Sequence, residues 1–448
     1  MTVRCILTLA GLVGAAECGF ARQTMPVITL GIWKEMIPPI PTERIKEVVS
    51  GLAASDFEVR EKAQATILTL GEKAAPQLRR ALATVADAEA RRRLSVIVKK
   101  LEYDRMTTAR TVTLVADRMT APDALRKLCS QSGYRIRCEG LGEDHEKKKR
   151  FDFAIRDRSF WEAIDVVCNR SGLGIQIEDD GGVRVYFQDA FNPHVSYSGP
   201  FRFVANQIHS GRYLPLGGLS RQALPTANPE SLSINLTVFA EPKTTLVGVR
   251  GPWILKMIDE AGKAVPQPPI DQSQSYYNGS NGNKSFSHNL NLSFCRPAKE
   301  AIKIKEIRAK ATLDLLTDIR PDVSIPDLLK AKGKKASGRS ASIEITEVVE
   351  TNGTATITAT ITNPTGNPND YQWVNSLWQR FEVADASGEK FQVNITNTNY
   401  NTPQNVTVIF QAIPPDGIKC GPPEKFTLVE WITRTTDVEF TFKDIPLP

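Results

Sequence analysis

An N-terminal stretch of the chain, residues 43–103, has apolar side chains at the spacing of a helix face. Ser55 followed by Glu58 has the spacing of a capping box at a helix start, and Gly71 is placed to end that helix. Asp87 is placed to open a later helix. The positions predicted to share the two faces are Val59, Ala63, Ile67 and Leu70, and then Ala90, Leu94, Ile97 and Leu101.

Residues 110–188 contain two copies of one pattern, each reading strand, helix, Ser-Gly, strand. The predicted helix starts pair Thr120 with Asp123 and Ser159 with Glu162, and the residues after the helix ends are Gly133 and Gly172. A turn rich in Asp and Gly then leads into a last strand at 183–187. The pattern predicts a β-α-β-β-α-β module in which two helices pack against one small sheet.

From residue 198 onward, apolar and polar residues alternate as in half-buried strands, for example at 232–238 and 354–362. A basic stretch of small residues, 333–340, is the predicted linker between two antiparallel sandwich-like parts, 198–330 and 340–448. One larger β unit is the alternative. The predicted fold class is therefore multidomain α+β: a short helical repeat segment, the β-α-β-β-α-β module, and an all-β C-terminal half.

The module resembles the short N-terminal domain of secretins and TonB-dependent receptors. The resemblance is carried by residues 112–115, 124–128, 132–136, 151–155, 161–167 and 172–177. In that family the domain binds protein partners or stacks into rings and has no catalytic role. The resemblance therefore implies a protein-interaction module within a secretion or signalling assembly.

Residues 43–103 resemble HEAT-type helical repeats through 56–60, Leu70-Gly71 and 75–78. The similarity spans little more than one repeat, and such arrays normally need about three repeats to be stable alone. We therefore expect this segment to pack on its neighbour or to act as a short spacer. The chain as a whole resembles exported bacterial multidomain proteins.

The first 23 residues have the features of a secretory signal. Arg4 precedes an apolar run from Cys5 to Ala16, and small residues follow it, so cleavage is predicted after Ala21 or after Ala16. The apolar run is shorter than the roughly 20 residues that a membrane-spanning helix needs. We expect an exported protein of the periplasm or cell envelope with no transmembrane segment in the mature chain.

The formal net charge of +6 is mild for 448 residues, and the basic clusters are local. Solvated loops account for them, so nucleic acid is not an expected partner. Two of the seven cysteines, Cys5 and Cys18, fall in the predicted signal, which leaves an odd number in the mature chain. At least one cysteine is then expected to be free or intermolecular.

No motif for catalysis or cofactor binding is present. The chain has no Gly-x-Ser-x-Gly elbow, and its Gly172-Leu173-Gly174 string follows a predicted helix where a dinucleotide fingerprint would open one. The four histidines and the cysteines do not have metal-ligand spacing. We therefore expect no catalytic, cofactor-binding or metal-binding residues, and no enzymatic activity.

One polar stretch, residues 271–289, combines Tyr276, Tyr277 and Phe286 with Gln, Ser, Asn and Gly. Flat aromatic rings on a flexible polar frame are typical of adaptable binding loops. These three aromatic residues are the candidate partner-binding residues, and an ordinary exposed insertion is the alternative. Trp373, Trp378 and Trp431 are expected in the core.

The expected function is that of a non-enzymatic envelope scaffold that binds protein or envelope-surface partners. A component of a secretion or signalling assembly is the first alternative, because of the module's resemblance. The second alternative is a hydrolase of envelope polymers, since a catalytic site can be assembled in space from distant residues.

Overall fold

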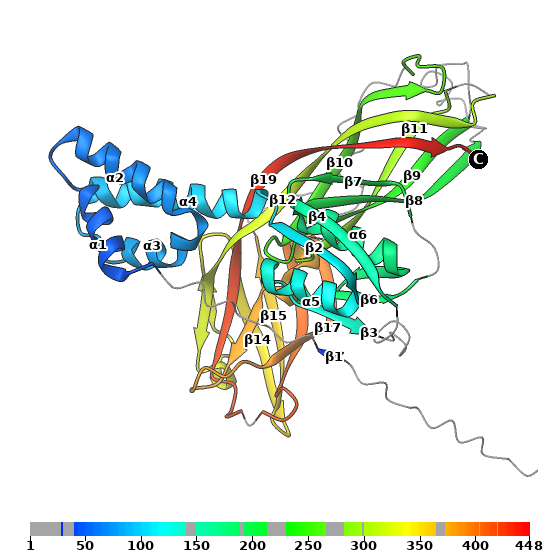
Figure 1. Ribbon diagram of the computed structural model, residues 1–448. Coiled ribbons are helices and arrows are strands. Elements are labelled where there is room, and N and C mark those ends of the chain that lie inside the picture. The colour runs from blue at the N-terminus through cyan, green and yellow to red at the C-terminus, as the bar shows by residue number, and fades with distance from the viewer. Residues whose placement is uncertain are drawn as a thin grey trace, which may run out of the picture.

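A computed structural model of the chain describes residues 28–29, 40–139, 149–188, 192–212, 230–265, 282–297, 300–363, 372–402, 404–418 and 420–448. The predicted signal, with its cleavage positions Ala16 and Ala21, lies outside these ranges, as do Tyr276 and Tyr277. The structure confirms the predicted fold class: a helical segment and an α/β module precede a β-rich C-terminal half (Figure 1).

The helical segment consists of α1 (Thr42–Gly51), α2 (Phe57–Leu70), α3 (Ala75–Leu82) and α4 (Ala88–Thr107). Its small core contains Ile45, Leu52, Ile67, Leu78 and Leu94. Asp87 caps α4 by accepting a hydrogen bond from the Ala90 amide, and α2 ends at Gly71 as predicted. The segment therefore buries one apolar face per helix, as the periodicity indicates.

The predicted start of α2 is wrong by one residue. The N-cap is Asp56, whose carboxylate accepts hydrogen bonds from the amides of Glu58 and Val59, and not Ser55. Val59 is also 47% exposed, although it was placed on the buried face. The helical period places Arg60, at the start of α2, on the same side as the buried face. The Arg60 guanidinium donates hydrogen bonds to backbone carbonyls that precede the helix.

The module has the predicted order of elements. These are β2 (Thr111–Met119), α5 (Ala121–Ser132), β3 (Ile136–Glu139), β4 (Phe151–Ser159), α6 (Phe160–Ser171), β5 (Leu173–Ile177) and β6 (Val183–Phe187). The prediction of one small sheet is wrong. Strands β2 and β4 form their own antiparallel pair, and the second sheet has the order β1-β3-β6-β5, with β1 at Ile28–Thr29. Both helices contact strands of both sheets, so the module core lies where the two helices and the two sheets meet.

The ends of α5 and α6 confirm the repeat. Thr120 accepts a hydrogen bond from the Asp123 amide, and Ser159 forms a complete capping box with Glu162. The glycines after the two helices adopt the left-handed conformation, with φ of +73° and +69°. Cys129 and Cys168, at equivalent helix positions, are both buried, and burial raises the pKa of each thiol.

The described residues of the β half form three sheets. The first contains β7 (Val195–Ser198), β8 (Phe201–Arg212), β9 (Glu230–Ala240) and β11 (Ser287–Cys295). The second contains β10 (Leu246–Asp259), β12 (Lys303–Pro326), β19 (Lys425–Pro446) and β16 (Phe381–Ala384). The third contains β13 (Lys335–Ser337), β14 (Ser342–Thr351), β15 (Thr354–Thr362), β17 (Gln392–Thr402) and β18 (Asn405–Ile413).

The two long strands β12 and β19 belong to both β cores. They pair antiparallel from Lys303 opposite Pro446 to Pro326 opposite Lys425, and Figure 1 shows them running from one sandwich into the other. Residues near one end, such as Leu313 and Phe440, lie in the core with β8 and β9. Residues near the other end, such as Ile325 and Phe426, lie in the core with β15 and β18. Among the described residues, the two large hydrophobic cores of the β half therefore share one sheet.

The linker predicted at residues 333–340 is not a simple linker. Strand β13 lies within it and pairs with β14, and the Asp322 carboxylate accepts hydrogen bonds from the amides of Arg339, Ser340 and Ala341. Small and basic residues therefore form a strand here because a neighbouring edge supplies hydrogen bonds. Within the described ranges, no helix has both the length and the apolar character to cross a bilayer.

Candidate ligand groove

A hollow of about 1020 Å³ lies where the module, the first β core and the segment before β16 meet. Its lining includes Asp180 from the last turn of the module and the stretch 283–289 that leads into β11. Trp378 and Gln379, from a short 3₁₀ turn at Leu377–Gln379, complete the lining. We call this hollow the wide cleft. It brings together residues from three parts of the chain.

A second hollow of about 650 Å³ adjoins the wide cleft, because Asn283 and Trp378 line both. Its other walls come from the short helix α7 (Gln372–Asn375) and from residues of β17. Tyr400, on β17, is 48% exposed in its wall. We call it the neutral hollow, and the two hollows together the groove.

Side-chain amides hold the two sides of the groove together. The amide group of Gln379 accepts a hydrogen bond from the Lys284 backbone N–H at 2.6 Å and donates one to the Lys284 carbonyl at 3.3 Å. The indole Nε1 of Trp378 donates to Oδ1 of Asn283 at 3.2 Å. These bonds fix the Trp378 ring relative to Asn283 while leaving the side chain 48% exposed. The prediction that Trp378 belongs to the core is wrong, whereas Trp431 is buried as expected.

Two cations stack on Trp431 behind the wide cleft. The Arg380 guanidinium carbon lies 4.1 Å from the centre of the Trp431 ring, and the Lys284 ammonium lies 5.2 Å from it. Burial lowers the pKa of Lys284 and lowers that of Arg380 to about 10. The face of the indole ring stabilises cations at these positions. Of the two residues, Lys284 lines the wide cleft, together with the acidic residues Asp179 and Asp180.

The candidate partner-binding residues have two different outcomes. Tyr276 and Tyr277 lie outside the described residues, so their role stays a prediction. Phe286 lines the wide cleft, where its ring packs on Gly181 in the last turn of the module. A Cβ atom on Gly181 would lie 2.9 Å from that ring, and Gly181 has a φ of +80°. Phe286 is therefore half-buried against the module in the wall of the cleft.

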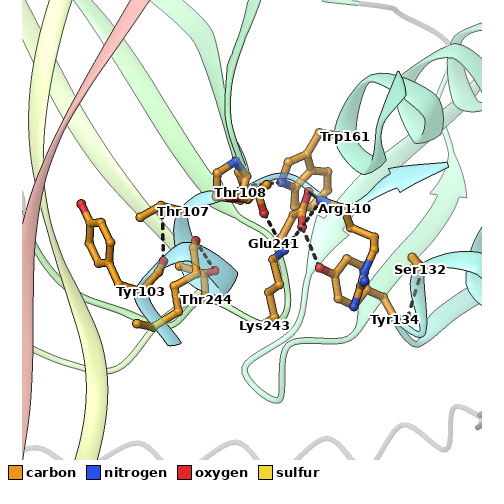
Figure 2. Close-up of polar contacts among 12 residues, drawn as sticks. Tyr103, Thr107, Thr108, Arg110, Ser132, Tyr134, Trp161, Glu241, Lys243 and Thr244 are labelled. Atoms are coloured by element: carbon orange, nitrogen blue, oxygen red, sulfur yellow. Dashed lines mark hydrogen bonds and ion pairs between the residues drawn. The ribbon is translucent and has the colours of Figure 1, made fainter. Parts of the chain in front are cut away.

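A sealed polar junction lies at the contact between the helical segment, the module and the first β core (Figure 2). Glu241, in the turn between β9 and β10, is fully buried. Its carboxylate accepts hydrogen bonds from the Arg110 amide at 3.0 and 3.1 Å and from the Tyr134 hydroxyl at 2.6 Å. The Lys243 ammonium lies 3.5 Å away. Burial raises the pKa of Glu241, and the neighbouring donors oppose that rise.

The same turn holds the end of α4. Lys243 Nζ donates to the Thr108 carbonyl at 2.6 Å, and the Thr244 hydroxyl donates to the Met106 carbonyl at 2.9 Å (Figure 2). These bonds satisfy carbonyl groups that the end of a helix leaves without intrahelical partners. Both oxygens of Glu241 are already engaged by protein donors, so the junction has a structural role.

A second buried carboxylate is also engaged by the protein itself. Asp165 on α6 accepts two hydrogen bonds from the Arg202 guanidinium, at 2.7 and 3.0 Å, and one from the Tyr197 hydroxyl at 2.6 Å. Burial and the charge of Asp165 raise the pKa of Tyr197. The cluster ties α6 to strands β7 and β8. Asp165 and Arg202 also line a small hollow of about 190 Å³, but both carboxylate oxygens already accept hydrogen bonds from protein donors.

Potential metal-ligating side chains are not gathered in the described part of the chain. Among those residues, no group of three or more His, Cys, Asp or Glu side chains is arranged to hold a metal ion. The lining of the groove combines aromatic rings, amides and hydroxyls with the charged residues Asp179, Asp180 and Lys284 of the wide cleft. An Asn-rich stretch in the sequence, 394–405, is the signal that could have pointed to one wall of the groove.

Comparison with known proteins leaves the groove as the main guide to function. No protein-family model, curated protein or solved structure matches this chain.

Proposed function

We propose that this protein is an exported, non-enzymatic scaffold of the cell envelope that captures a partner in the groove. The observation that carries the proposal is Trp378, a large aromatic side chain that is 48% exposed and yet held by a hydrogen bond to Asn283. An exposed aromatic ring with a fixed orientation loses little conformational entropy when a partner covers it.

The position of the groove supports this proposal. Its walls come from the module, the first β core and the second β core, and each of these is anchored by its own buried residues. The cores share β12 and β19, so the walls are connected through a continuous sheet. The hydrogen bonds between Gln379 and Lys284 and between Trp378 and Asn283 hold the lining segments in place, and a preorganised lining favours selective capture.

A capture experiment with the mature protein tests the proposal. Immobilised wild-type protein and the Trp378→Ala variant are incubated with solubilised envelope material, and bound proteins and polysaccharides are identified. We expect at least one partner to be retained by wild type and lost by the variant. Phe57→Ala is the matched control, because Phe57 is 61% exposed on α2.

Two results would contradict the proposal. One is a set of retained partners that is identical for wild type and Trp378→Ala. The other is turnover of an envelope polymer by purified wild-type protein, since this would establish the hydrolase alternative.

A further inference from the structure

The neutral hollow has a lining that differs in charge from that of the wide cleft. Of the described residues that line the neutral hollow, none carries a formal charge. The wide cleft, in contrast, includes Asp179, Asp180 and Lys284. The polar side chains of the neutral hollow are Asn283, Asn375, Asn394 and Thr398, beside the rings of Trp378 and Tyr400.

This set of groups fits a neutral ligand that is rich in hydroxyls. An Asn side chain offers both a donor and an acceptor, and so does the Thr hydroxyl. A sugar hydroxyl also donates and accepts, so each amide can pair with either function of the ligand. A charged ligand would lose its hydration without gaining an opposite charge from this lining, which is unfavourable.

The two aromatic rings supply the apolar part of the recognition. Trp378 and Tyr400 come from the 3₁₀ turn and from β17, and each is 48% exposed. A pyranose ring has a face of C–H groups, and burying that face on an aromatic ring removes apolar area from water. A volume of about 650 Å³ lies within the range of ligand pockets and accommodates a short stretch of a glycan chain.

We propose that the neutral hollow binds a neutral glycan, with sugar rings stacked on Trp378 and Tyr400 and with hydroxyls bonded to the surrounding amides. The inference rests on the proposed function, because it names the class of ligand that the groove captures. The hydrogen bond from Trp378 to Asn283 has a positioning role in this recognition. It holds the indole ring so that its face is presented to the ligand.

Direct binding measurements test the proposal. The mature protein is screened against neutral gluco-, manno-, galacto- and chito-oligosaccharides and against acidic polysaccharides, and hits are measured by titration calorimetry. We expect a neutral glycan to bind. The affinity should fall at least tenfold in Trp378→Ala and in Tyr400→Ala, and should stay within twofold in Phe57→Ala. Thermal unfolding verifies that each variant is folded.

The other outcomes separate this inference from the proposed function. If no neutral glycan binds but an envelope protein is captured in a Trp378-dependent manner, the glycan inference is overturned and the scaffold proposal stands. If only acidic polysaccharides bind, with an affinity that Trp378→Ala leaves unchanged, the glycan inference is again overturned. If neither glycans nor envelope proteins depend on Trp378, both proposals fail.

Discussion

The sealed junction at Glu241 and the groove at Trp378 both join three parts of the chain, but they differ in exposure and charge. At the junction, the Glu241 carboxylate is fully buried and accepts hydrogen bonds from the Arg110 amide and the Tyr134 hydroxyl. At the groove, the Lys284–Gln379 and Trp378–Asn283 hydrogen bonds form the frame, while the Trp378 side chain stays 48% exposed. The difference shows that buried polar groups with complete partners serve stability here. The aromatic surface that the frame leaves uncovered is the part suited to binding.

The largest expected effect follows from removing the carboxylate of the junction. Glu241→Ala leaves the Tyr134 hydroxyl, the Arg110 amide and the Lys243 ammonium without this buried acceptor. We expect a loss of about 3–5 kcal/mol in the free energy of unfolding, measured by urea denaturation. Glu347→Ala is the control, since Glu347 is exposed, and it should change stability by less than about 0.5 kcal/mol. A loss below about 1 kcal/mol for Glu241→Ala would show that the junction is not sealed.

A somewhat smaller effect is expected at the second buried carboxylate. Asp165→Asn keeps the shape of the side chain but turns an NH₂ group towards donors from Arg202 or Tyr197. We expect a loss of about 2–4 kcal/mol, because the buried guanidinium loses its counter-charge. Urea denaturation of the variant, with Asp416→Asn as the exposed control, measures this difference. Equal midpoints for both variants would contradict the structural role of Asp165.

The pH dependence of stability distinguishes the junction from the groove. Because the pKa of Glu241 is raised in the folded state, the folded protein holds this proton to higher pH than the unfolded chain does. The resulting stabilisation is present below the unfolded pKa of about 4.3 and is lost as pH rises through the folded pKa. Subtracting the free energy of unfolding of Glu241→Gln from that of wild type, at each pH between 4 and 8, isolates the pH dependence that Glu241 causes. A difference that rises with pH would contradict the direction of the shift.

The smallest effect on stability is expected at the open side of the groove. Trp378→Ala should change the free energy of unfolding by less than about 1 kcal/mol, because its ring is 48% exposed. Trp431→Ala removes a buried ring under Arg380 and should cost about 3–5 kcal/mol. Comparing the unfolding midpoints of these two tryptophan variants tests the contrast directly. A similar loss for both would place Trp378 in the core.

The sequence predicts those parts of the fold and of the site whose interacting residues lie close together along the chain. The capping pairs Thr120–Asp123 and Ser159–Glu162 lie three residues apart, and both were predicted correctly. Trp378 was predicted to be buried and is exposed, because its neighbours in space come from residues 95 positions away in the chain. Phe286 was predicted as a candidate partner-binding residue, and it is half-buried in the cleft wall because the turn of the module covers part of its ring.

The sequence by itself determined the local elements. Alternating apolar residues defined β15, and the Ser-Gly pairs defined the ends of α5 and α6, because these signals depend on sterics and hydrogen bonds within a few residues. Only the tertiary structure decided that β12 and β19 are shared by two cores, that Glu241 meets Tyr134, and that Trp378 stays open. Strand pairing and burial at these places depend on segments about 100 residues apart, and their relative positions are set by the packing of whole sheets.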